Sequence, residues 1–300
     1  MKAIQFARYG GPDVLELVEV TEPHAADGQV RIQVRAAGVN AMDWKLRSGQ
    51  LQEMMPLSLP SGTGVDAAGL VDEVGAGVSD VKIGDAVFGS GFDTCSECAV
   101  LTSWAPKPDS LSFEQAAGLP IPVETAIRIL DQVGVQPEQT LLVSGASGGV
   151  GSAVIQIAVE RRIRVIGTAN PSNQEYVSSR GAIATTYGPG LVDRVRALAP
   201  AGIAAALDIA GSGVITELVE LTGDATKVLS IADFSAPQHG AQVSGTAQEP
   251  AAALAEAVRL WQTGALDIPV ERTFTLADTG LAQLASEQGH TTGRLVVTLP

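Results

Sequence analysis

The stretch Thr140-Leu-Leu-Val-Ser-Gly-Ala-Ser-Gly-Gly-Val-Gly151 decides the fold of the central part of the chain. Apolar and β-branched residues lead into a glycine cluster, and a helical pattern of apolar residues runs from it to Ala158. A strand, a tight glycine turn and a helix N-terminus together hold a pyrophosphate, because free N–H groups face the anion and absent side chains let it approach. The spacing G-x-x-G-x-x-G is a weak signal alone, and its position between strand and helix strengthens it. The alternative is a glycine-rich turn without a ligand.

Length, charge and hydropathy narrow the class of protein. A chain of 300 residues with 45% hydrophobic content can bury a large core, and we expect two domains. The net charge of −14 argues against a nucleic acid or an anionic membrane as partner. No apolar run is long enough to span a bilayer, and the first residues lack the apolar centre of a signal peptide. We therefore expect a cytoplasmic protein.

The only two cysteines, Cys95 and Cys98, lie in C-S-E-C. A zinc site needs four ligands, and no second C-x-x-C or nearby histidine pair supplies the others. A redox dithiol is typically followed by a helix, whereas the next residues, V-L-T-S-W, read as a strand. We interpret the two thiols as having no special role.

The order of predicted elements indicates an α/β fold in two parts. Residues 1–104 read mainly as glycine-punctuated strands, which predicts a bent β domain. From Thr140, strands and helices alternate with short connections, which is typical of a doubly wound parallel sheet of the Rossmann kind. The last stretch returns to β structure. We expect one domain from residues 1–119 and 266–300 and a nucleotide-binding domain from residues 120–265.

The strand after the glycine turn indicates which nucleotide binds. In dinucleotide folds an acid at the end of this strand pairs with the ribose hydroxyls and favours NAD. Here the strand Val165–Asn170 ends without an acid, and Asn170 and Ser172 offer neutral donors. Without the acid, nothing repels a 2′-phosphate, which favours NADP(H). Arg180 and Arg294 are the basic candidates, and the alternative for each is a solvated surface arginine.

Several motifs in order resemble the medium-chain dehydrogenase/reductase superfamily, and more narrowly its zinc-free quinone oxidoreductase (zeta-crystallin-like) branch. They are G-G-P-D-V-L-E-L from Gly10, V-R-A-A-G-V-N-A-M-D-W-K from Val34, G-V-D-A-A-G-L-V-D-E-V-G-A-G-V from Gly64, G-D-A-V-F-G from Gly84, the glycine turn, and G-H-T-T-G-R from Gly289. The resemblance spans nearly the whole chain. It implies a GroES-like catalytic domain made from both chain ends, a central Rossmann domain, NADPH as cofactor and a homodimer.

The same resemblance argues against a catalytic metal. Where zinc alcohol dehydrogenases of this superfamily carry a ligand cysteine and a ligand histidine, this chain has Asn40 and Val65. Valine offers no ligand atom, and a neutral amide is a poor substitute for a thiolate. Without a Lewis acid, alcohol oxidation is poorly supported. Hydride transfer to a quinone or an α,β-unsaturated carbonyl is easier, because conjugation already provides the electron sink.

Three residues are candidates for the catalytic site. Asn40 could donate a hydrogen bond to the developing oxyanion, or it could be a structural amide. Asp43 matches a segment that flanks the cleft in the family, with an ion pair to Lys45 as the alternative. Related enzymes often carry a tyrosine soon after the R-S-G segment, whereas here Gly49 is followed by Gln-Leu-Gln and no tyrosine is nearby in the sequence. Tyr9 could face the cleft instead, or pack on the surface.

The resemblance also implies a set of cofactor contacts. We expect the pyrophosphate to lie at Ser147, Gly148, Gly149 and Val150, and the adenosine phosphate at Asn170, Ser172 and Tyr187. Thr125 and Ile231 are expected near the nicotinamide. Arg294 is expected to reach the cofactor from the C-terminal strand. The methionine-bearing loop 50–59 is expected to wall a pocket for a small apolar acceptor.

Three functions stay open. The first is an NADPH-dependent, zinc-free quinone or enone reductase, and the second is a reductase of one enoyl or ring double bond in a biosynthetic pathway. The third is a non-catalytic NADPH-binding protein with a structural or regulatory role. An exposed strand edge at residues 241–246 could pair across a two-fold axis in a homodimer.

Overall fold

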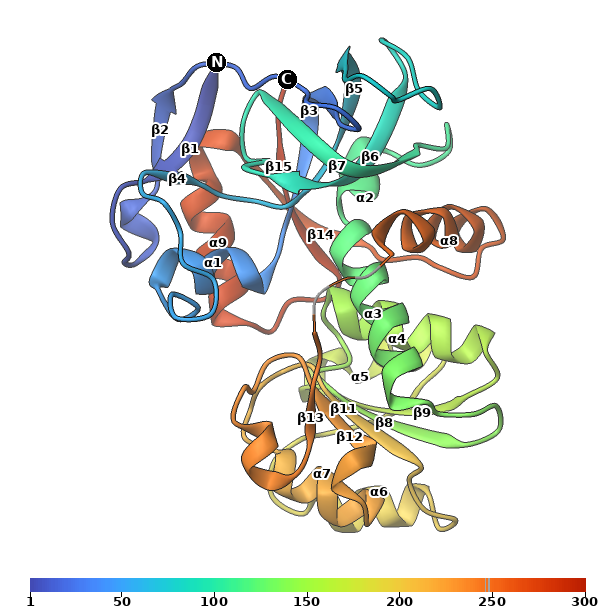
Figure 1. Cartoon of the computed structure of the whole chain (residues 1–300). Coiled ribbons are helices and arrows are strands. Elements are labelled where there is room, and N and C mark those ends of the chain that lie inside the picture. Colours follow the sequence, from blue (N-terminus) through green and yellow to red (C-terminus); the bar gives the residue numbers. More distant parts are fainter. Residues whose placement is uncertain (246, 248) are drawn as a thin grey trace. The chain divides into compact units, whose positions relative to one another are not determined.

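The computed structural model describes residues 1–245, 247 and 249–300, which form two units (Figure 1). Unit 1 comprises Met1–Ile121, Glu249–Gln262 and Ile268–Pro300, and unit 2 comprises Pro122–Gln248 and Thr263–Asp267. The division differs from the expected one at helix α8, Pro250–Gln262, which belongs with unit 1. This helix packs on strand β7, and Trp261 Nε1 donates to Ser110 Oγ at 3.3 Å.

Unit 1 is built on two sheets. One has three strands in the order β2-β1-β4, and the other has six in the order β14-β15-β3-β5-β6-β7, with an additional β3–β7 pairing that closes its second half on itself. The strands are β1 Lys2–Phe6, β2 Glu16–Glu19, β3 Val30–Val39, β4 Ser61–Gly62, β5 Asp66–Val74, β6 Ala86–Phe92, β7 Cys98–Pro106, β14 Val270–Thr275 and β15 Arg294–Thr298. Both chain ends thus contribute to one β domain, as expected.

The helices of unit 1 are α1 Ala41–Ser48, α2 Phe113–Ala117, α8 and α9 Thr279–Gln288. A capping box stands at the start of α2, where the side chains of Ser112 and Gln115 each bond to the other's backbone. Helix α1 begins after Asn40, whose N–H donates to Asp43 Oδ2 at 2.7 Å, and it ends at Gly49 with a left-handed φ of 84°.

Unit 2 contains a six-stranded, entirely parallel sheet in the order β10-β9-β8-β11-β12-β13. The Rossmann prediction is confirmed. Its strands are β8 Thr140–Ser144, β9 Arg164–Thr168, β10 Ile183–Thr185, β11 Ala205–Asp208, β12 Val228–Ser230 and β13 Gln242–Val243. The predicted strand 241–246 is thus shorter, and Thr246 lies outside the described residues.

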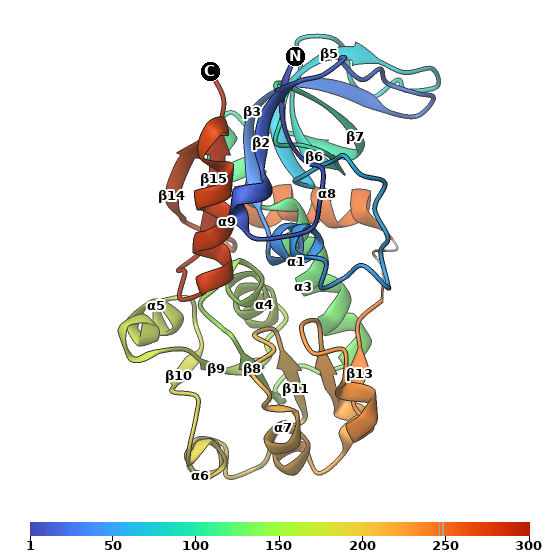
Figure 2. The same ribbon diagram turned by 90° about the vertical axis from the view of Figure 1, so that its left-hand side faces the viewer.

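Helices cover both faces of the parallel sheet. They are α3 Pro120–Val133, α4 Gly149–Glu160, α5 Gln174–Ser179, α6 Leu191–Leu198 and α7 Ile215–Thr222. Figures 1 and 2 show α4 and α5 on one face and α6 and α7 on the other. The chain leaves β8 toward β9 and later returns on its other side as β11, so the strand order reverses there. Ligands of such sheets bind at the carboxyl ends of the strands beside this reversal.

Candidate active site

The glycine turn stands at the carboxyl end of β8, where a strand enters helix α4. Gly145 adopts a left-handed φ of 87°, and a Cβ on Gly151 would lie 2.3 Å from the Gly145 carbonyl oxygen, so strand and helix approach too closely for a side chain. A Cβ on Gly148 would meet nothing within 4 Å. The four residues predicted at the pyrophosphate, from Ser147 to Val150, are partly exposed at the start of α4. The turn therefore has room for an anion at a helix N-terminus.

Neutral side chains surround the carboxyl end of β9, next to the glycine turn. Asn170 Oδ1 accepts from the Asn173 N–H at 2.9 Å and from Ser172 Oγ at 2.8 Å. Asn173 Nδ2 donates to Ser147 Oγ at 3.3 Å, which joins this loop to the glycine turn. Two of the residues predicted at the adenosine phosphate, Asn170 and Ser172, thus lie beside the turn, with no acid at the end of the strand.

Tyr187, the third predicted adenosine contact, follows β10 and is 48% exposed. Strands β9 and β10 are neighbours, and the Ala169 N–H donates to the Thr185 carbonyl at 3.0 Å, so both loops leave the same edge of the sheet. Arg180 is partnered elsewhere: its Nη1 lies 2.7 Å from Asp267 Oδ2, and its guanidinium stacks over Tyr176 at 4.9 Å. The Tyr176 hydroxyl lies 2.8 Å from Ser152 Oγ on α4.

The two residues expected near the nicotinamide lie elsewhere in unit 2. Thr125, on α3, is buried, and its hydroxyl lies 3.4 Å from Glu124 Oε2. Ile231 follows β12 and donates its N–H to the Asp208 carbonyl at 3.0 Å. The buried Asp208 carboxylate accepts from Ser230 Oγ at 2.8 Å and from the Gly211 N–H at 3.0 Å. These bonds fix the ends of β11 and β12.

Unit 1 contains a buried polar cluster around Asn40, a position that the resemblance matches to a zinc ligand. Asn40 Nδ2 donates to Asp66 Oδ2 at 2.9 Å, and Arg294 Nη2 donates to Asn40 Oδ1 at 3.1 Å. Arg294 Nη2 lies 3.4 Å from the same Asp66 oxygen, and the Ile121 N–H donates to the other at 3.1 Å. Asp43 joins the cluster through the backbone of Asn40. Residues from three distant segments thus meet: the predicted Asn40, Asp43 and Arg294, and Asp66.

Burial changes the charges in this cluster. It raises the pKa of Asp43 to about 7 and that of Asp66 to about 7, because the low-dielectric interior disfavours the charged carboxylate. The Arg294 guanidinium acts in the opposite direction on both, and its own pKa is lowered by burial. Since two acids face one cation, the cluster can carry a proton near neutral pH.

The cluster does not fit a zinc ion. The Asn40 amide already bonds to Asp66 and Arg294, so a guanidinium provides the positive charge among these side chains. Val65 has no ligand atom. Within the described ranges 1–245, 247 and 249–300, no group of three or more His, Cys, Asp or Glu side chains could hold a metal ion. The Nδ2 group of Asn40 has a second hydrogen besides the one that Asp66 accepts.

Tyr9 and the methionine-bearing loop also belong to unit 1. The Tyr9 ring lies beside Gly49, where a Cβ would be 3.2 Å from Cγ of the ring, and its centroid is 6.4 Å from that of Phe6. These contacts place Tyr9 at the end of α1, whereas the polar cluster lies at its start. In the loop 50–59, Met54 is 54% and Met55 43% exposed, so apolar side chains are available to a ligand.

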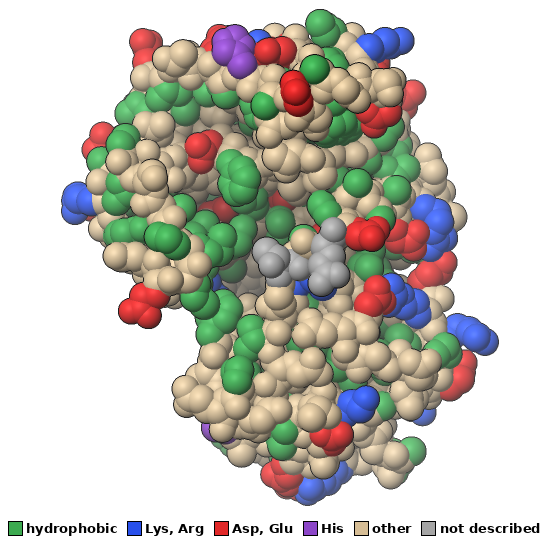
Figure 3. Space-filling model, in the orientation of Figure 1, with side chains coloured by type: hydrophobic (Ala, Val, Ile, Leu, Met, Phe, Trp, Pro, Cys, Tyr) green, Lys and Arg blue, Asp and Glu red, His purple; other side chains and the backbone are tan. Residues whose placement is uncertain are grey.

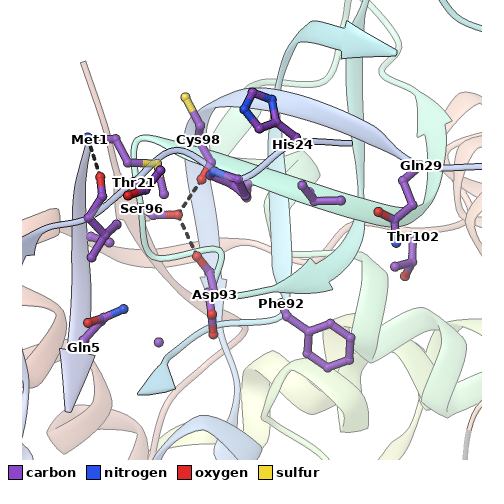
Figure 4. Close-up of a pocket in the computed structure, with 16 residues that line it drawn as sticks. Met1, Gln5, Thr21, His24, Gln29, Phe92, Asp93, Ser96, Cys98 and Thr102 are labelled. Atoms are coloured by element: carbon purple, nitrogen blue, oxygen red, sulfur yellow. Dashed lines mark hydrogen bonds between the residues drawn. The ribbon is translucent and has the colours of Figure 1, made fainter. Parts of the chain in front are cut away.

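Both cysteines are free and buried. Burial raises the pKa of each thiol. Both therefore stay protonated and unreactive, because the thiolate is the nucleophile. Cys98 lines a pocket of about 390 Å³ between β1 and the β6–β7 hairpin (Figure 4). At its wall, Ser96 Oγ donates to the carbonyls of Asp93 at 2.6 Å and Cys98 at 2.8 Å. None of the predicted site residues lines this pocket.

Sequence reasoning missed two parts of the site. Asp66 stands alone in an apolar strand segment, and a buried acid there requires a partner, which is a signal that could have indicated the ion pair. Gln174 was also missed: its Nε2 donates to the carbonyls of Ala169, Asn170 and Thr185 at 2.8, 3.1 and 3.0 Å and so ties the ends of β9 and β10 together. No motif indicates such a backbone contact.

Comparison with known proteins agrees with this architecture. The alcohol dehydrogenase GroES-like domain family matches residues 26–112, and the zinc-binding dehydrogenase family matches residues 183–297. The structure of the quinone oxidoreductase from Coxiella burnetii is 30% identical, covers 100% of this chain and 99% of that one, and has a TM-score of 0.85. The chain belongs to the quinone oxidoreductase branch of the medium-chain dehydrogenase/reductase superfamily.

Two other members of this superfamily indicate the cofactor of related proteins. The Escherichia coli quinone oxidoreductase complexed with NADPH is 25% identical over 100% of both chains, with a TM-score of 0.89. An NADPH-dependent alkenal/one oxidoreductase of Arabidopsis thaliana is 37% identical over 197 residues, which is 61% of this chain. The alignment spans only 51% of that relative, so the chain matches about half of its length.

Proposed function

We propose that this protein is a zinc-independent, NADPH-dependent oxidoreductase that transfers a hydride to a quinone or an α,β-unsaturated carbonyl. The observation that carries the proposal is the open glycine turn beside a β9 end that offers only neutral side chains. An acid there would repel a 2′-phosphate, and none is present. The NADPH complex of the E. coli relative and the name of the Arabidopsis relative support the same cofactor.

Bound NADPH would supply a hydride, which is one hydrogen together with its electron pair, to the acceptor. The residues of this chain would do the rest. The turn from Ser147 to Val150 would hold the pyrophosphate, while Asn170, Ser172 and Tyr187 would contact the adenosine phosphate. Thr125 and Ile231 would position the nicotinamide, and the exposed methionines of the loop 50–59 would favour an apolar acceptor.

Asn40 would stabilise the oxyanion that forms on the acceptor. Its amide is held in one orientation by Asp66 and Arg294, and preorganised donors stabilise developing charge without a reorganisation cost. Asp43 supports this arrangement by holding the Asn40 backbone, which makes it a positioning residue. Tyr9 stays a predicted second contact to the substrate, and Arg294 a predicted contact to the cofactor.

The test is a steady-state assay with purified protein, NADPH or NADH, and a panel of quinones, 2-alkenals and enoyl thioesters. We expect NADPH oxidation with at least one quinone or enone and a lower rate with NADH. Activity restricted to enoyl or ring double bonds of larger substrates would favour the biosynthetic reductase instead. Tight NADPH binding without turnover across the panel would favour a non-catalytic protein.

Location and assembly are further parts of the proposal. Acidic and basic side chains are interspersed on the face shown in Figure 3. We expect no nucleic-acid partner, because the net charge is −14. In the described part of the chain, no helix has the length and apolar character to cross a membrane. We expect a cytoplasmic homodimer. Cell fractionation and light scattering during size-exclusion chromatography test the two expectations.

A further inference from the structure

The loop that carries Tyr187 has little structure of its own. It runs from Thr186 to Gly190 as Thr-Tyr-Gly-Pro-Gly, between β10 and α6. Gly188 and Gly190 adopt left-handed φ values of 84° and 77°, and glycine loses more conformational freedom than any other residue when it is fixed. A loop of this composition needs contacts from outside to hold one conformation.

Arg194, on the first turn of α6, supplies these contacts. Its Nη1 donates to the Pro189 carbonyl at 2.7 Å, and its Nη2 donates to the carbonyls of Thr186, Tyr187 and Gly188 at 2.9, 3.3 and 3.3 Å. One guanidinium thus contacts four successive carbonyls. Only arginine has a planar, fixed fork of donors that can do this, and its bonds are strengthened by its charge.

The neighbouring loop, which follows β9, is held by a different side chain. Gln174 ties the loop after β9 to Thr185 at the end of β10. The position of Tyr187, whose ring is about half exposed, therefore depends on the backbone that Arg194 holds. The guanidinium also offsets the negative ends of four carbonyl groups, which would otherwise disfavour a phosphate dianion beside the loop.

We propose that Arg194 is a positioning residue for cofactor choice: it holds the Tyr187 loop in the conformation that accepts the adenosine 2′-phosphate. The proposal rests on the NADPH dependence proposed above. It concerns discrimination, because NADH has no phosphate at this position and gains little from an ordered loop. The side chain acts through Tyr187 and the loop backbone, and touches no reacting atom.

The experiment measures binding of NADPH, NADH and 2′,5′-ADP by calorimetry, without an acceptor, in the wild type and in Arg194→Met. Arg196→Met is the matched control, because Arg196 lies on the same helix, is 57% exposed and pairs with Glu220 at 2.9 Å. We expect Arg194→Met to weaken the binding of NADPH and of 2′,5′-ADP about tenfold, because the loop must then be ordered on binding. The binding of NADH should weaken much less. Arg196→Met should change none of the three.

Two further variants keep the proposal falsifiable. Arg194→Lys keeps the charge but cannot span four carbonyls, so its ratio of NADH to NADPH dissociation constants should fall between those of the wild type and Arg194→Met. In a protein that already carries Tyr187→Ala, adding Arg194→Met should weaken NADPH binding little further, because the two residues act as a unit. An unchanged ratio in a folded Arg194→Met or Arg194→Lys protein overturns the proposal, as does an equal loss for both cofactors.

The outcomes separate this proposal from the proposed function. A wild type that binds NADPH in preference to NADH but reduces no acceptor would contradict the enzymatic function and leave the role of Arg194 to be judged from the binding ratios. A wild type that oxidises NADPH while Arg194→Met keeps the wild-type ratio would contradict the role of Arg194 alone. A wild type with no preference between the cofactors overturns the inference directly.

Discussion

Gly148 and Gly151 stand three residues apart, and each lacks a side chain for a different reason. A methyl group at Gly151 would overlap the Gly145 carbonyl, whereas one at Gly148 would enter open space at the helix N-terminus. Gly148 has φ −75°, which alanine adopts without strain. The first glycine is therefore expected to matter for the cofactor and the second for the fold.

The paired substitutions test this distinction. Gly151→Ala should lower the free energy of unfolding by about 1–3 kcal/mol, because the backbone must shift to accept the methyl group. Gly148→Ala should change the free energy of unfolding by less than about 0.5 kcal/mol. It should weaken the binding of NADPH about tenfold or more. Urea unfolding and NADPH titration measure the two effects. Equal behaviour of the two variants would contradict the assignment of Gly148 to the pyrophosphate.

The buried acids predict a pH dependence of stability. The pKa of Asp43 is raised to about 7 in the folded protein, above its unfolded value of about 3.9. Between these values the folded state keeps a proton that the unfolded state releases, so the free energy of unfolding falls as pH rises from about 4 to about 7 and then levels off. Asp43→Asn removes this contribution.

The measurement compares wild type and Asp43→Asn by urea unfolding at pH 5 and pH 8. Asparagine imitates the protonated acid and can still accept the Asn40 N–H bond. We expect the stability of the wild type, relative to the variant, to be lower at pH 8 than at pH 5. A difference that stays constant with pH would show that the Asp43 carboxyl titrates in its ordinary range.

For single residues, the sequence predicted which residues belong to the site better than it predicted their hydrogen-bond partners. Asn40, Asp43 and Arg294 were all candidates, but nothing in their spacing shows that they meet, because they come from segments up to 254 residues apart. The Asn40 amide, for which the sequence left open an oxyanion donor or a structural amide, uses one donor and its acceptor within the protein. Such pairings depend on tertiary packing, which local patterns do not encode.

At the scale of helices and strands, α1 and α9 illustrate how a buried charge joins two elements. Arg47, on α1, is completely buried, and its Nη2 lies 2.9 Å from Glu287 Oε2 on α9. A second ion pair, Arg196–Glu220 at 2.9 Å, joins α6 and α7 at the surface. The two pairs have the same N–O distance, but the arginine is buried in the first and exposed in the second.

Glu287→Gln and Glu220→Gln therefore form a matched pair. Glu287→Gln should lower the free energy of unfolding by about 2 kcal/mol or more, because a buried guanidinium loses its counter-charge. Glu220→Gln should cost less than about 1 kcal/mol, as is usual for an exposed ion pair. Thermal and urea unfolding measure both. A cost for Glu287→Gln no larger than that for Glu220→Gln would show that Arg47 does not depend on this carboxylate.

Elements were the most predictable level of the structure. The strand that leads into the glycine turn and the helix that follows it were expected from local sequence, because apolar periodicity acts over a few positions. The placement of α8 was not, since its apolar face packs on β7 of unit 1, about 150 residues earlier in the chain. Which surface an amphipathic helix covers is a tertiary property.

For the whole molecule, the two chain ends build one β domain and the middle of the chain builds the nucleotide-binding sheet. This arrangement and the match to the Coxiella burnetii structure over the full chain place the protein in the quinone oxidoreductase branch. The Arg294 guanidinium lies beside Asn40, a position that the resemblance matches to a zinc ligand of zinc alcohol dehydrogenases. We therefore propose that the protein transfers hydride from NADPH without a metal.

The most direct test follows the hydride itself in chelator-treated protein. NADPH deuterated at carbon 4 of the nicotinamide is supplied with an α,β-unsaturated ketone, and the product is analysed by mass spectrometry and NMR. A parallel sample with a quinone measures NADPH oxidation before and after chelation. We predict one deuterium on the β-carbon of the product and rates that chelation leaves unchanged. Loss of activity on chelation with recovery on adding zinc, or no deuterium transfer and no quinone reduction, would contradict the claim.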